Sequence, residues 1–205
     1  KVVGSKISID CDCLGMSGGW TPAVHLFTQS GGKLKFRDDD QVFIPDTYPS
    51  DQISIGSCNG EFTLDEILLS ISKKLQDFLN IKKTEYENLE IQSHFNKTKR
   101  NIWLLPSDKI IGKTKPFVDY QNDATAKDIK LALREGFRSI EHVKRYTTTG
   151  MGTDQGKLGN MHALGIISET AGTKMGEHGT TTFRPPYTPL TFGTIVGRNV
   201  GEFFD

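Results

Sequence analysis

The chain has 205 residues, of which 36% are hydrophobic and 24% are charged, a balance typical of a folded globular protein rather than a disordered one. Its 25 basic and 25 acidic side chains cancel, so no overall field would draw it to nucleic acid or to an anionic membrane surface. No apolar run approaches the roughly 20 residues that a membrane span needs and no signal peptide opens the chain, so we expect a cytoplasmic protein.

The first 60 residues predict strands and turns. Residues 7–13 alternate between apolar or cysteine side chains and polar ones, which indicates a half-buried strand ending at a glycine-rich turn. Residues 34–36 and 42–44 flank the Asp38–Asp40 turn, which we expect to be solvated, and predict a hairpin. The cysteines, at 11, 13 and 58, are odd in number and unsuited to an easy disulfide, so we expect buried thiols and no metal site.

A helix is predicted after the hairpin and a short strand. Thr63 and Glu66 have the spacing of a capping box, and the apolar residues from 64 to 79 fall on one helical face, which we interpret as core. Residues 82–115 are polar apart from an apolar knot at 103–106, and they predict a linker that docks locally.

The second half of the chain predicts three short helices around one loop. Thr125 caps the first helix with Asp128, Gly136 ends it, and Ser139 caps the second. We expect the third helix over 157–170, followed by an extended tail.

The loop at 142–157, HVKRYTTTGMGTDQGK, combines basic, threonine and glycine residues. It lacks the complete spacing of a P-loop or of a dinucleotide-binding fingerprint. Gly150 and Gly152 are expected to leave backbone N–H groups without partners in the chain. Together with the nearby cations, these groups favour the binding of an anion. A simple turn with solvated cations explains the same residues, and both interpretations stay open. The five histidines are scattered, so we expect them to be structural or exposed.

Three long segments carry a family resemblance, namely CDCLGMSGGWTPAVHLFTQSGGKLKF, TKPFVDYQNDATAKDIKLALREGFRSIEHVKRYTTTGMGTDQGK and TTFRPPYTPLTFGT. They closely resemble the alpha subunit of heterotetrameric, tetrahydrofolate-linked sarcosine oxidase, with the chain as an internal segment. The resemblance implies an α+β fold with the closing strands, hairpin and helix of a disulfide-reductase-like NAD-binding domain (1–81), a linker (82–115), a small helical module (116–172), and an extended lead-in to a missing folate-binding domain (173–205).

The helical module also resembles a small iron–sulfur domain of related oxidoreductases. The positions of that domain's cysteines are occupied here by Asp119, Gln121, Asp154 and Gly159. No thiolate remains to hold iron, so we expect no iron–sulfur cluster and no other metal site.

The resemblance further implies FMN at the interface between the alpha and beta subunits. The residues that would surround its phosphate and ribityl chain are Lys144, Arg145, Thr147, Thr148, Gln155 and Lys157. NAD, FAD and tetrahydrofolate would belong to the full complex without complete sites in this segment.

We expect an oxidoreductase acting on CH–NH donors, which oxidises sarcosine to glycine in a complex with beta, gamma and delta subunits. The segment itself would carry no catalytic residue and bind neither nucleic acid nor membrane. The alternatives are a non-catalytic docking module and a subunit of a related amine, opine or proline dehydrogenase.

Overall fold

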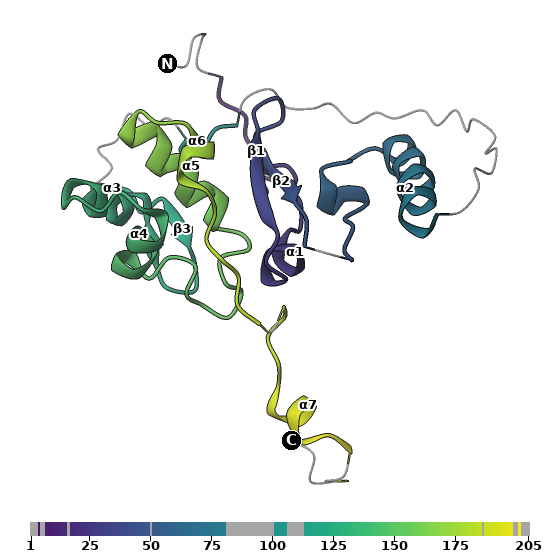
Figure 1. Ribbon diagram of the computed structural model, residues 1–205. Helices are drawn as coiled ribbons and strands as arrows, with labels where there is room; N and C mark the ends of the chain where they lie inside the picture. Colours follow the sequence, from purple (N-terminus) through teal and green to yellow (C-terminus); the bar gives the residue numbers. More distant parts are fainter. Residues whose placement is uncertain are drawn as a thin grey trace.

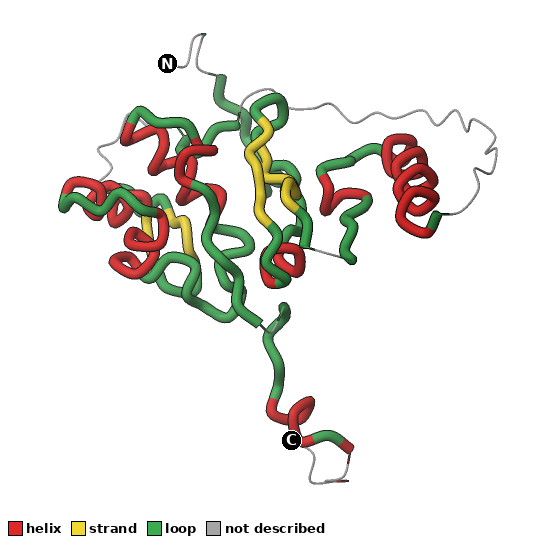
Figure 2. The backbone as a smooth tube through the Cα atoms, viewed as in Figure 1, coloured by secondary structure: helices red, strands yellow, loops and turns green. Residues whose placement is uncertain are grey.

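The computed structural model describes residues 4, 7–15, 17–49, 51–80, 101–105, 113–185, 187–198 and 201 (Figures 1 and 2). Its strands are β1 (Lys33–Arg37), β2 (Val42–Thr47), β3 (Phe117–Asp119) and β4 (Ala124–Thr125). Its helical elements are α1 (His25–Gln29), the 3-10 turn η1 (Gly56–Asn59), α2 (Leu64–Leu79), α3 (Ala126–Arg134), α4 (Ile140–Thr147), α5 (Asn160–Ala171), α6 (Met175–His178) and α7 (Phe192–Val196). The expected mixture of helices and strands is confirmed.

The predicted hairpin is confirmed. β1 and β2 pair in antiparallel register, with Phe36 opposite Phe43, and a two-stranded sheet results. The turn between them is more than a solvated loop, because Arg37 pairs with Asp40, whose side chain is only 7% exposed. No strand forms at residues 52–55, which precede η1 without ladder bonds.

The core lies among α3, α4 and α5 (Figure 1). Ile129, Val143 and Ile167, one from each helix, are at most 1% exposed. Phe43 from β2 and Met175 from α6 belong to the same cluster, so the hairpin packs on the helices. The division of the chain into separate domains stays a prediction.

Local signals placed the starts of these helices well. Thr125 and Asp128 form the predicted capping box of α3, and α4 begins after Ser139, although the Ser139 hydroxyl makes no capping bond. α5 begins at Asn160 rather than Lys157, because Gly156 has a positive φ of 71° and turns the chain before the helix.

α2 has the predicted ends but not the predicted environment. Thr63 and Glu66 complete a capping box, which confirms the start of the helix. None of its residues is buried, and its apolar side chains remain partly or largely exposed, with Leu69 at 67%. In Figure 1 α2 lies beyond η1, on the side of the hairpin away from α3–α5, so the interpretation of its stripe as core is wrong within the described residues.

The strand predicted at residues 7–13 is absent. Ile7 and Ile9 are both 78% exposed, and this segment pairs with none of the described strands. Alternation predicts a strand only where a neighbouring strand accepts its hydrogen bonds. Cys11 and Cys13 are therefore exposed, against the expectation of buried thiols, while Cys58 is half-buried.

Residues 101–105 dock on the module. A β-carbon at Gly165 would overlap the Trp103 ring, so α5 presents a glycine where the indole lies. Beyond α5 the tail is not wholly extended, since it contains the short helices α6 and α7. Among the described residues no helix combines the length and apolar character that crossing a membrane requires.

Candidate functional site

The candidate loop follows α4 and packs closely around the side chain of Asn160. Thr148 ends α4 with a positive φ of 60°, and Gly150 and Gly156 have φ values of 72° and 71°. A β-carbon at either glycine would collide with the amide group of Asn160. The glycines therefore serve both the turn geometry and the close approach of the loop to the first residue of α5.

Asp119, at the end of β3, anchors the loop. Its carboxylate accepts hydrogen bonds from the backbone N–H groups of Gly150 (2.6 Å), Gln121 (2.8 Å) and Asn122 (3.0 Å), and the residue is only 6% exposed. Burial opposes the charged form, but the hydrogen bonds from these amides hold the pKa of Asp119 below its ordinary value. An anion of the chain itself therefore fills the amide nest.

Gln121 makes a second connection to the same loop. Its amide nitrogen donates to the Thr153 hydroxyl at 3.1 Å, and its carbonyl oxygen accepts from the Asp154 backbone N–H at 3.2 Å. A β-carbon at Gly152 would overlap the Gln121 side chain. Polar contacts from the β3 turn thus position both ends of the glycine-rich stretch.

Other loop amides are also bonded within the chain. Met151 donates to the Thr148 carbonyl, Gln155 to the Gly152 carbonyl, and Gly156 to the Asp154 carboxylate. The expectation that Gly150 leaves its N–H group for an external anion is wrong, because Asp119 accepts that hydrogen. The N–H groups of Gly150, Met151, Gln155 and Gly156 are therefore not available to a phosphate, and the side chains of the loop become the main candidates for a ligand contact.

Lys144 and Arg145 lie in the last turn of α4. Arg145 pairs with Glu141 at 3.2 Å and also donates to the Glu141 carbonyl at 2.9 Å. The Arg145 side chain is still 61% exposed, and Lys144 is half-buried. Cations at a helix C-terminus are favoured by the helix dipole, so both side chains stabilise α4 while remaining accessible from solvent.

The two candidate threonines differ in accessibility. Thr147 is buried, and its hydroxyl bonds to the Val143 carbonyl and to the Thr149 hydroxyl, each at 2.8 Å. Thr148 is exposed, and its hydroxyl donates to the Thr147 carbonyl at 2.6 Å. Of this pair, only Thr148 presents its side chain to a ligand at the surface.

Gln155 and Lys157 hold the tail. The Gln155 amide donates to the Arg184 carbonyl at 2.7 Å and accepts from the Arg184 N–H at 2.6 Å. Lys157 donates to the Tyr187 carbonyl, and its ammonium lies 4.3 Å from the centre of the Tyr187 ring. The structure thus separates the six candidates, with Lys144, Arg145 and Thr148 at the surface of one loop end and Gln155 and Lys157 against the tail.

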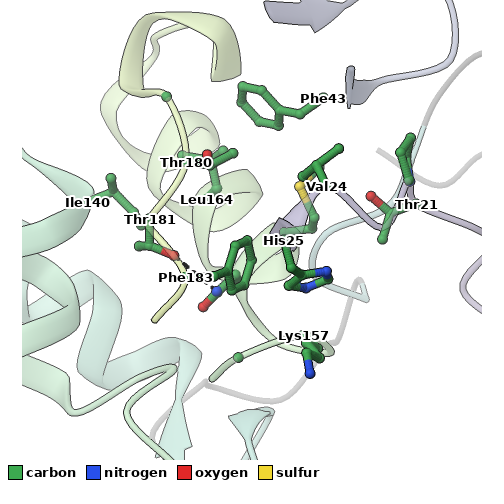
Figure 3. Close-up of a pocket in the computed structure, with 15 residues that line it drawn as sticks. Thr21, Val24, His25, Phe43, Ile140, Lys157, Leu164, Thr180, Thr181 and Phe183 are labelled. Atoms are coloured by element: carbon green, nitrogen blue, oxygen red, sulfur yellow. Dashed lines mark hydrogen bonds between the residues drawn. The ribbon is translucent and has the colours of Figure 1, made fainter. Parts of the chain in front are cut away.

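His25 is a further site residue that sequence reasoning missed. It is 9% exposed, and its ring lies 4.0 Å, centre to centre, from Phe183 (Figure 3). Burial lowers the pKa of His25 to about 4, and the charge of Lys157 acts in the same direction. The available signal was its place in the apolar stretch Val24 to Phe27, which predicts a buried position.

Comparison with protein families points to one group. Residues 113–198 match the family model described as the sarcosine oxidase A3 domain. The chain is 35% identical to the sarcosine oxidase alpha subunit of Rhizobium meliloti (strain 1021), an alignment that covers 98% of this chain and 20% of that protein. It is 33% identical to the corresponding subunit of Corynebacterium sp. (strain P-1), over 100% of this chain and 22% of that protein.

The chain corresponds to a segment of the sarcosine oxidase alpha subunit. It spans about a fifth of the length of these curated relatives. A shorter match, 33% identical, joins 36% of the chain to 16% of an opine oxidase subunit of Rhizobium meliloti (strain 1021). In structure the chain resembles L-proline dehydrogenase from P. horikoshii, with a TM-score of 0.56 and 22% identity over 85% of this chain and 37% of that one, which shows a common fold.

Proposed function

We propose that the chain is part of the alpha subunit of a sarcosine-oxidase-type flavoenzyme, an oxidoreductase that converts sarcosine to glycine. The observation that carries this proposal is the 33–35% identity to sarcosine oxidase alpha subunits over nearly the whole chain. In the proposed assembly the beta subunit holds the catalytic centre, with gamma and delta subunits completing a heterotetramer. NAD, FAD and tetrahydrofolate belong to that assembly rather than to this segment.

The segment's proposed part is to contact FMN at the interface with the beta subunit. FMN supplies electron transfer when it is bound. Lys144 and Arg145 contribute positive charge to its phosphate, and Thr148 contributes a hydroxyl. Arg145 and Thr148 are exposed and Lys144 is half-buried at one end of α4, and this access from solvent supports the role. Because the amides of Gly150, Met151 and residues 154–157 are bonded internally, the proposal assigns the contact to side chains of this chain, and the partner chain completes the phosphate site.

The remaining candidates are assigned different parts in the same proposal. The Thr147 hydroxyl supports the backbone of the loop from inside, since it is buried and bonded to Val143. Gln155 and Lys157 fix the tail next to the loop, through Arg184 and Tyr187. These residues shape the surroundings of the flavin without a direct bond to its phosphate.

We also propose that residues 116–172 are an iron–sulfur-domain-like module in which polar contacts stand where the cluster would be. The four positions that resemble cluster ligands converge in space. Gln121 accepts a hydrogen bond from the Asp154 amide, and Asp119 accepts one from the amide of Gly150 in the same loop. A β-carbon at Gly159 would overlap the carbonyl of Val118, the residue before Asp119. This convergence supports a retained scaffold whose metal site has become a hydrogen-bond network.

The flavin contact is tested with the complex of this chain and its partner subunits. Lys144→Ala and Arg145→Ala each remove one charge-assisted contact, worth about 1.5–3 kcal/mol, and each should weaken FMN retention about tenfold or more. FMN per complex is measured by absorbance after gel filtration. Arg138→Ala, an exposed cation before the other end of α4, is the matched control. Full FMN retention in both loop variants would contradict the proposal.

A docking module is the second candidate, and the contacts of Gln155 and Lys157 with the tail favour it. In that function the loop organises the chain and binds no cofactor. The partial similarity to the opine oxidase subunit leaves a third candidate, a related amine or opine dehydrogenase subunit. Turnover of the assembled complex with sarcosine and with an opine, measured side by side, distinguishes the substrates. Assembly with normal flavin content in the loop variants would favour docking.

A further inference from the structure

A small cavity lies where α1, the start of α5 and residues 179–183 meet (Figure 3). Its volume is about 50 Å³, and its walls are mainly apolar, with side chains that include Val24, Phe43, Leu164 and Phe183. A site needs about 10–15 Å³ of such space for each water molecule, so the cavity has room for roughly three or four waters or an equally small ligand.

His25 contributes an unpaired polar atom to this apolar environment. It lines the cavity and is 9% exposed, and its Nδ1 atom is buried without a hydrogen-bond partner within the described residues. A buried polar atom that lacks a partner is costly, and such atoms in native proteins usually meet a water or a ligand. The imidazole therefore marks a place where a hydrogen-bonding group is expected.

The charges around the cavity select the kind of ligand. Lys157 lines it, and no carboxylate side chain is among the described residues that do so. The Lys157 ammonium is fixed over the Tyr187 ring and to the Tyr187 carbonyl, so its charge is held near His25. A fixed cation, a neutral imidazole and no opposing acid favour an anionic group over a cationic one.

We propose that this cavity binds a short-chain carboxylate of about three to five non-hydrogen atoms. Its carboxylate would accept a hydrogen bond from Nδ1–H of His25 near Lys157, and its alkyl end would lie among Val24, Phe43 and Leu164. This site does not depend on the proposed flavin contact, with which it shares only Lys157.

The test uses three probes of one size and different charge on the full chain. Propionate, 1-propanol and propylammonium are titrated while the ring signals of His25 are followed by nuclear magnetic resonance. We expect saturable shifts with propionate at a Kd on the order of 1 mM, binding of propanol at least about tenfold weaker, and none with propylammonium. Equal responses to all three probes would contradict the proposed charge preference. A His25 ring bonded only to water, with no response to propionate, would overturn the site.

Two variants connect the binding to its residues. Lys157→Met keeps the length of the side chain and removes its charge, and it should weaken propionate binding at least about tenfold, whereas Lys174→Met, at an exposed position, should not change it. His25→Phe should abolish the stabilisation that propionate gives against thermal unfolding. Unchanged propionate binding in Lys157→Met would contradict the proposal even if His25→Phe fails to fold.

Lys144→Ala and Arg145→Ala should leave propionate binding intact. The failure of the flavin proposal is therefore measured separately from the failure of this one.

Discussion

The apolar stripe of α2 and those of α3 and α4 are similarly regular in sequence, yet their surroundings differ. Ile129 and Val143 are at most 1% exposed, because α3, α4 and α5 cover one another and receive Phe43 from β2. Leu68 and Phe78 on the stripe of α2 are 38% and 45% exposed, since the main described neighbour of that helix is the short turn η1. Periodicity thus predicts that a helix has an apolar face, while the chain topology decides whether anything covers it.

The largest expected difference between these regions is in core stability. Ile129→Ala should lower the free energy of unfolding by about 3–4 kcal/mol, because it empties a fully buried position. Leu68→Ala on α2 should change it by less than about 0.5 kcal/mol. Urea unfolding followed by circular dichroism measures both. Similar losses in the two variants would show that α2 is covered in solution and would end the contrast.

The stability of the packing between α1 and the module should depend on pH through His25. The pKa of His25 is about 4 in the folded protein, below its ordinary value of 6.5. The unfolded chain therefore binds the proton first, so stability is full above pH 6.5 and falls as the pH decreases towards 4, by up to about 3 kcal/mol.

Unfolding free energies of the wild type and of His25→Gln between pH 7 and about pH 4 test this expectation. The variant should lose less stability over that range than the wild type. Parallel curves would show that His25 takes up a proton as readily in the folded state as in the unfolded state. In that case Phe183 and the rest of the tail would not shield its ring from water.

The buried carboxylate of the module should matter more than a carboxylate on α2. Asp119→Asn should cost about 2 kcal/mol, because a neutral amide accepts less well from the amides of Gly150, Gln121 and Asn122. Asp77→Asn on exposed α2 should be nearly neutral. The contribution of Asp119 is present above its unfolded pKa and disappears as the pH falls through its lower folded pKa.

Thermal unfolding at neutral pH and in acid measures the effect of Asp119. The difference between wild type and Asp119→Asn should shrink as the pH falls. An equal difference at all pH values would assign the loss to packing rather than to the charged hydrogen bonds.

The smallest expected effect concerns the tail. Gln155→Ala removes both hydrogen bonds to the Arg184 backbone, and exchange of the Arg184 amide hydrogen should become about fivefold faster, equivalent to about 1 kcal/mol. Gln76→Ala on α2 is the matched control, and it should leave that exchange rate unchanged. Unchanged exchange in Gln155→Ala would mean that the other contacts suffice to hold residues 180–187.

Local chemistry made much of the fold predictable. Thr63 and Thr125 indicated two helix starts through capping boxes, and the Asp38–Asp40 turn indicated the hairpin. The strand predicted at 7–13 failed because alternation does not supply a neighbour. The short α6 and α7 were missed, since helices of four or five residues carry hardly one turn of periodicity.

The candidate site was predictable only in part, because its decisive contacts span long stretches of sequence. The basic and glycine residues of the loop are visible in the sequence, but Asp119, which takes the Gly150 amide, lies 31 positions away. Phe183, which packs on His25, comes from the opposite end of the chain. Residue types thus indicated that the loop was unusual, while tertiary contacts decided which of its groups remain for a ligand.

The bond pair between Gln155 and Arg184 has a consequence for sequence variation. Gln155 contacts Arg184 through the main chain, at one carbonyl and one N–H group. Almost any side chain at position 184 would preserve both bonds, whereas proline would remove the one that needs the N–H group and leave the one to the carbonyl. The direction in which the polypeptide leaves the module is therefore insensitive to most substitutions at position 184 and depends instead on the side chains that bind its backbone, Gln155, Gln29 and Lys157.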